Sequence, residues 1–102
     1  MRHLAVATIP TQTFVEHADR ALALVRAELR RPKGDRTSRA SDADLNYALR
    51  RIEEMRRRAL DRTLPERGAR YPVLTRLVVD HWRLAGEIGR AIVALEEEYG
   101  RL

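Results

Sequence analysis

The sequence predicts an all-α protein, a small antiparallel bundle of three helices with four helices as the alternative. Three stretches repeat apolar residues every three or four positions, which is the spacing of one helix face. Two stretches that contain proline and glycine separate them, and no segment alternates with the two-residue period of a strand. With 102 residues and a hydrophobic fraction of 44%, we expect one domain.

The first helix is predicted over residues 12–31, after an N-terminal arm of residues 1–10. Thr13 and Glu16 have the spacing of a capping box, in which side chains satisfy free amides of the first turn. The apolar run of the arm, residues 4–9, is shorter than a secretory or membrane-spanning segment requires. The helix carries one apolar stripe, formed by Phe14, Val15, Ala18, Ala21, Leu22, Val25 and Leu29.

The second helix is predicted over residues 42–63, between a basic loop of residues 32–41 and a second loop of residues 64–72. Ser41 and Asp44 have the spacing of a residue that caps a helix and the amide that it binds. The apolar face of this helix comprises Leu45, Ala48, Leu49, Ile52, Met55, Ala59 and Leu60.

The last segment, residues 73–99, is predicted to be one long helix that ends at Gly100. Gly86 and Gly89 each cost about 1 kcal/mol inside a helix, but the apolar periodicity continues across them. A break at Gly86 is the alternative. The coiled-coil-like seam is Leu74, Leu77, His81, Leu84, Ile88, Ala91 and Leu95, which makes His81 a predicted core residue bonded to a neighbouring helix.

The composition indicates binding rather than catalysis. The net charge is +5 and the pI about 10.6, which suits a nucleic-acid partner. The chain has no cysteine, which fits a cytoplasmic location and excludes disulfides and thiolate chemistry. We recognise no nucleophile with a base, no phosphate-binding glycine loop and no metal-ligand spacing, so we expect no enzyme, metal, cofactor, membrane or small-molecule partner. The carboxylates at 96–98 are interpreted as a solvated helix end or as a contact for a basic partner.

The segment RRIEEMRRRALDR, residues 50–62, is the most arginine-rich part of the chain. On a helix, Glu53 and Glu54 lie four residues before Arg57 and Arg58, in the order that favours ion pairs. Arg50 and Arg57 are therefore interpreted as part of a solvated surface.

Three other arginines of this segment form a row. Arg51, Arg58 and Arg62 lie within about 40° of one another beside the apolar face. The planar guanidinium matches a phosphate, so the row predicts a non-catalytic subunit that binds an RNA or DNA backbone without sequence readout, within a larger complex. If the basic loop folds onto the same side, it extends the row with Arg31, Lys33, Arg36 and Arg39. The alternative is that the arginine stems cover the edge of the core.

Arg26 and Arg56 fall within the apolar faces of their helices. A charge in such a position must be paired or must reach solvent. We expect ion pairs to a neighbouring helix or side chains that extend to water, with a buried functional arginine or a subunit contact as the alternative.

A second apolar strip on the last segment predicts a partner protein or self-association. Its members lie within about 40° of Trp82 on a regular helix. The strip consists of Val79, Trp82, Gly86, Gly89 and Val93. The alternative function is therefore a helical protein–protein interaction module, such as a homo-oligomer, an adaptor or an inhibitor.

Arg76 and His81 have the spacing R-x4-H, which is similar to the short motif of HEPN-type ribonucleases. The resemblance implies that the pair could position and polarise a ribose hydroxyl and its phosphate. Leu77 follows the arginine where that family commonly has a polar residue. On a regular helix the two side chains point about 140° apart, so a ribonuclease is the remote alternative.

Overall fold

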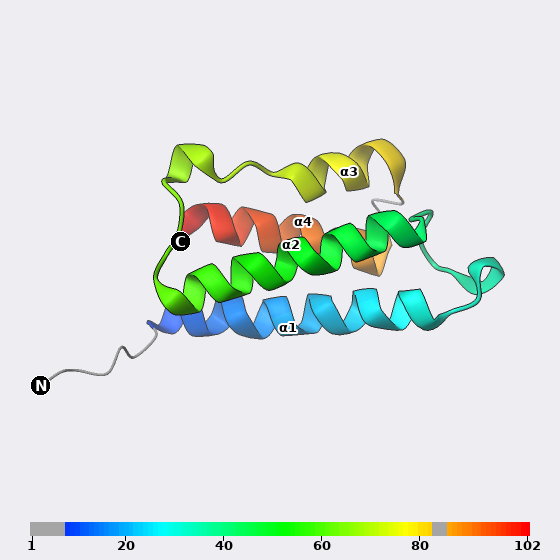
Figure 1. Ribbon diagram of the computed structural model, residues 1–102, viewed down its shortest axis with the longest axis horizontal. Helices are drawn as coiled ribbons and strands as arrows, with labels where there is room; N and C mark the ends of the chain where they lie inside the picture. Colours follow the sequence, from blue (N-terminus) through cyan, green and yellow to red (C-terminus); the bar gives the residue numbers. More distant parts are fainter. Residues whose placement is uncertain (1–7, 83–85) are drawn as a thin grey trace, which may run out of the picture.

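The structure, a computed structural model, describes residues 8–82 and 86–102 and confirms the all-α prediction with four helices (Figure 1). No strand occurs in those ranges, and none of their helices has the length and hydrophobicity needed to cross a membrane. The helices are α1 (Ile9–Arg30), α2 (Asp42–Asp61), α3 (Val73–His81) and α4 (Glu87–Arg101), with short 3-10 turns η1 (Lys33–Asp35) and η2 (Arg67–Ala69).

The start of α1 lies earlier than the sequence predicted. Thr8 caps the helix, because its hydroxyl accepts a hydrogen bond from the amide of Thr11 at 3.2 Å. Pro10 stands in the first turn, where its missing amide costs nothing. The predicted capping box of Thr13 and Glu16 is wrong, since both residues lie inside α1.

Both ends of α2 have a clear cause. The predicted Ser41 cap is confirmed, with the Asp44 amide donating to Oγ at 3.1 Å. The helix ends at Asp61, two residues before the predicted end, because Arg62 adopts the left-handed conformation (φ 60°). The Thr63 amide then bonds back to the Arg58 carbonyl at 3.0 Å and closes the helix end.

The prediction of one long final helix is wrong, and its alternative, a break at Gly86, is right. The helix α3 ends at His81, Trp82 is extended, and α4 begins after Gly86. The two helices fold back on each other (Figure 1). Of the predicted seam, Leu74, Ile88 and Leu95 are buried, whereas Leu77 and Ala91 are only partly buried. Leu84, one member of the predicted seam, lies outside the described residues. The C-terminal end of the last helix also differs from the predicted end at Gly100, since α4 continues through Gly100 to Arg101.

His81 is exposed, so its assignment as a core residue is wrong. It is the last residue of α3, and the extended chain that follows turns Trp82 into the core in its place.

One hydrophobic core joins all four helices. Helix α1 packs against α2 and α4, and α3 packs against α4, with each pair antiparallel (Figure 1). Full burial of one large apolar side chain stabilises a fold by about 1.5–3 kcal/mol. Fully buried members are Phe14, Val25, Leu45, Ile52, Met55, Leu74, Val78, Ile92, Leu95 and Tyr99.

Two ion pairs cross between α1 and α2. Arg26 pairs with Glu53 at 2.9 Å, and Arg56 pairs with Asp19 at 2.7 Å. Of the two expected arrangements, an ion pair to a neighbouring helix or a side chain that extends to water, both arginines adopt the ion pair. The side chains are about half exposed, so each pair contributes about 0–1 kcal/mol and acts mainly on the register of the two helices.

A buried carboxylate on α4 caps α3. Glu96 accepts hydrogen bonds from the amides of Leu74 (3.0 Å) and Thr75 (2.6 Å) and from the Thr75 hydroxyl (2.8 Å). The interpretation of residues 96–98 as a solvated end is wrong for Glu96, which lies in the core. With nine residues, α3 is too short to be stable alone, so this contact fixes it to α4.

Replacing Glu96 with glutamine should lower the free energy of unfolding by about 1–3 kcal/mol, because a neutral amide accepts these three hydrogen bonds less strongly. Urea denaturation followed by circular dichroism measures the change. The exposed neighbour Glu97→Gln is the matched control and should leave stability unchanged. Equal losses in the two variants would contradict the capping role of Glu96.

Candidate nucleic-acid interface

Helices α2 and α3 pack only loosely against each other. The other neighbouring helices pack directly, whereas among the described residues α2 and α3 have no comparable packing. Two long hydrogen bonds connect α2 to the residues that precede and follow α3. Trp82 Nε1 donates to Asp44 Oδ2 at 3.3 Å, and Arg51 Nη2 donates to the carbonyl of Tyr71 at 3.4 Å.

An open surface groove of about 450 Å³ occupies the side of the bundle between α2 and α3. A second hollow of about 270 Å³ adjoins it, since both include Tyr71 and Val73. The first hollow is lined by Tyr47, Arg50, Arg51, Glu54, Ala69, Tyr71 and Val73, and the second adds Pro72 and Arg76.

Arginines outnumber carboxylates along this surface. Arg50 and Arg76 are exposed, and Arg51 is half-buried. The carboxylate of the lining, Glu54, is shared between Arg51 at 4.0 Å and Arg58 at 3.2 Å. The groove therefore has a net positive charge.

Two members of the predicted phosphate-binding row hold the linker between α2 and α3 in place. Arg51 donates to the Tyr71 carbonyl, and Arg58 donates to the Thr63 carbonyl at 2.8 Å. Both also pair with Glu54. Their guanidinium groups contribute positive charge beside the groove, but several of their N–H donors are already engaged.

Arg70 anchors the linker from within. Its Nε donates to the Pro65 carbonyl at 2.8 Å, and its Nη1 donates to the Tyr99 carbonyl at 3.0 Å. The guanidinium groups of Arg51 and Arg70 lie 6.0 and 5.8 Å from the centre of the Tyr99 ring. Burial raises the pKa of Tyr99 although nearby arginines favour the phenolate, so the ring is neutral at physiological pH.

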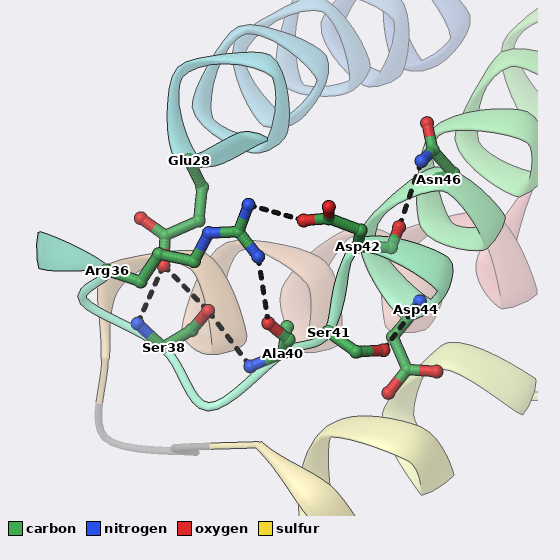
Figure 2. A network of polar contacts seen from close by, with 8 residues as sticks. All are labelled: Glu28, Arg36, Ser38, Ala40, Ser41, Asp42, Asp44 and Asn46. Atoms are coloured by element: carbon green, nitrogen blue, oxygen red, sulfur yellow. Dashed lines mark hydrogen bonds and ion pairs between the residues drawn. The ribbon is translucent and has the colours of Figure 1, made fainter. Parts of the chain in front are cut away.

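The basic loop between α1 and α2 is held by a polar network (Figure 2). The Arg36 side chain, 7% exposed, forms an ion pair with Asp42 and donates to the Ala40 carbonyl at 3.4 Å. The hydrogen bond from Arg36 lowers the pKa of Asp42. The assignment of Arg36 to a phosphate-binding surface is therefore corrected: the guanidinium is buried and joins the loop to the start of α2.

Glu28 holds the same loop from α1 (Figure 2). Its carboxylate accepts from the Ser38 amide and hydroxyl, both at 2.7 Å, and from the Thr37 hydroxyl at 3.1 Å. Burial acts to raise the pKa of Glu28, but the hydrogen bonds from Ser38 and Thr37 together leave it below its ordinary value. The loop is thus tied to a buried, charged carboxylate.

The remaining loop cations lie at the opposite end of α2 from Arg58 and Arg62, two members of the arginine row. Arg31, Lys33 and Arg39 are exposed, and Arg31 reaches Glu28 at 3.5 Å. The loop adjoins the start of α2, whereas Arg58 and the exposed Arg62 lie at its other end (Figure 1). The length of α2 is about 30 Å at 1.5 Å per residue. The loop is thus separated from Arg58 and Arg62 by most of the length of α2.

The predicted apolar strip around Trp82 does not exist as one surface. Trp82 is 6% exposed and Gly89 is buried, so neither can contact a partner. Val79 is 57% exposed on α3, while Val93 is half-buried on α4 and Gly86 lies in the break between them. The prediction of the strip assumed a continuous helix, and the break at Gly86 divides the residues of the strip between α3 and α4.

Arg76 and His81 are both exposed on α3. Five residues apart on this helix, their side chains point about 140° apart and do not converge on one substrate atom. Within residues 8–82 and 86–102, no group of three or more His, Cys, Asp or Glu side chains is placed to hold a metal ion.

Sequence reasoning missed Tyr47 and Tyr71 and treated Arg50 as an ordinary solvated residue. One signal was present, since Tyr47, Arg51 and Arg58 are spaced by four and seven residues on one side of α2. Tyr71 gave no such signal, because its place beside α2 depends on the path of the linker.

Replacing Ser38 with alanine should lower stability by about 1–2 kcal/mol at neutral pH, because a buried carboxylate loses a hydrogen-bond donor. A lowered carboxyl pKa contributes stability above the unfolded-state pKa and loses it as pH falls through the folded-state pKa. The difference in the free energy of unfolding between wild type and variant should therefore become smaller as the pH falls. Thermal unfolding across that pH range measures it, and a difference independent of pH would contradict the role of Glu28.

Comparison of the chain with protein-family models, curated proteins and solved structures found no match.

Proposed function

We propose that this protein binds the backbone of RNA or DNA at the groove between α2 and α3, without base-sequence readout and without catalysis. The observation that carries the proposal is the groove itself, lined by Arg50, Arg51 and Arg76 and by one carboxylate that is already paired. The proposal also includes membership of a larger complex. It includes a cytoplasmic location, which is expected because the chain has no cysteine.

The chemistry of the lining suits phosphate. A guanidinium presents parallel N–H donors to two phosphate oxygens and keeps its charge at every physiological pH. Arg50 and Arg76 are exposed, and each lines a hollow that Tyr71 also lines, so a chain of phosphates that follows the two hollows would meet both. The net charge of +5 adds a favourable field that does not depend on base sequence.

The alternative function, a protein–protein interaction module, depended on an exposed Trp82. Trp82 is buried by its own chain and donates its indole N–H to Asp44. Val79 is the strongly exposed member of the former strip, and one valine is a small surface for a stable interface.

Replacing Arg50 and Arg76 together with glutamine should weaken binding of an oligonucleotide about tenfold at low salt, because two phosphate contacts are lost. The slope of log affinity against log salt should fall by about 1.4–1.8, corresponding to two released counterions. Fluorescence anisotropy at several salt concentrations measures both.

The matched control replaces Arg20 and Arg30, exposed on α1, with glutamine and removes the same charge elsewhere. This control should retain most of the affinity and of the salt slope. Equal losses in the two double variants would show that net charge, and not the groove, accounts for binding.

A further inference from the structure

Two tyrosines expose their rings beside the arginines of the groove. Tyr71 is 64% exposed and Tyr47 is 43% exposed, and both line the larger hollow. Tyr71 also lines the smaller hollow, so it belongs to both. Guanidinium groups beside exposed aromatic rings form the combination that binds single strands, in which charge follows the backbone and rings stack on bases.

We propose that the groove is selective for single-stranded RNA or DNA, with bases stacked on Tyr71 and Tyr47 while Arg50 and Arg76 contact the flanking phosphates. This inference rests on the proposed function and names the class of nucleic acid that it serves. In a duplex the faces of the bases are covered by their neighbours, so the tyrosines add affinity only for a single strand.

The backbone that carries Tyr71 is fixed before any ligand arrives. Its carbonyl accepts from Arg51 Nη2 at 3.4 Å and from the Val73 amide at 2.9 Å, and Pro72 follows it. Arg70 ties the same linker to the end of α4. A ring presented from a fixed backbone loses little conformational entropy on binding, which raises affinity.

The aromatic residues distinguish a single strand from other acidic partners. A polyglutamate chain can neutralise the arginines, but it offers no flat ring to stack on tyrosine. Sensitivity to Tyr71 and Tyr47 with the arginines left in place therefore separates stacking of bases from simple neutralisation of the arginines by an acidic polypeptide.

The experiment measures binding of the full chain to oligothymidine and oligouridine of about 20 nucleotides, and to duplexes of matched length, by fluorescence anisotropy at low and physiological salt. The variants are Tyr71→Leu and Tyr47→Leu, singly and together. The controls are Tyr71→Phe, which keeps the ring, and Val79→Ala, which alters an exposed apolar side chain outside the groove lining. Circular dichroism verifies that each variant is folded.

Wild type should bind the single strands at least about fivefold more tightly than the duplexes. Each leucine variant should weaken single-strand binding by about 5- to 100-fold and leave duplex binding within about twofold. Tyr71→Phe and Val79→Ala should both bind like wild type.

Two outcomes separate this inference from the proposed function. Equal affinity for single strands and duplexes, or leucine variants that bind like wild type while the Arg50/Arg76 variant is weakened, overturns the stacking role and leaves backbone binding in place. Absence of binding to any nucleic acid at low salt overturns both. Displacement of the oligonucleotide by polyglutamate, with no effect of the leucine variants, assigns the groove to an acidic polypeptide and also overturns the inference.

Discussion

The carboxylate of Glu96 fixes the geometry on which the groove depends. By accepting three hydrogen bonds from Leu74 and Thr75, it sets the start of α3 against α4 and not against α2. The resulting gap between α2 and α3 is where the Tyr71 linker runs, held by Arg51 at one edge. A structural contact in the core thus determines a surface feature on the other side of α3.

The arginines of this chain have different roles that composition does not distinguish. Arg36, Arg58 and Arg70 donate to main-chain carbonyls and hold loops and helix ends. Arg50 and Arg76 stand exposed beside the groove. An arginine-rich sequence without disulfides can use guanidinium groups to fix irregular backbone, since each reaches several carbonyls at once. Net charge alone therefore overstates the charge available to a partner.

The sequence predicted the helices better than the surface. Stripes at helical spacing and the Ser41 cap are local signals, and they placed α1 and α2 closely. The break at Gly86 was missed because one long helix and two helices folded back on each other give the same periodicity. Trp82 was misplaced for the same reason. The position of Tyr71 could not be predicted, because the position of a linker residue depends on tertiary hydrogen bonds and not on its neighbours in sequence.

The central claim is that a polyanion meets this protein between α2 and α3. Titration of the isotopically labelled chain with a short oligothymidine, followed by amide chemical shifts in NMR, tests it most directly. The account predicts that the largest changes fall on residues of the groove, among them Tyr47, Arg50, Tyr71 and Arg76. Largest changes in the loop around Lys33 and Arg39, at the far end of the molecule from Arg62, would contradict it.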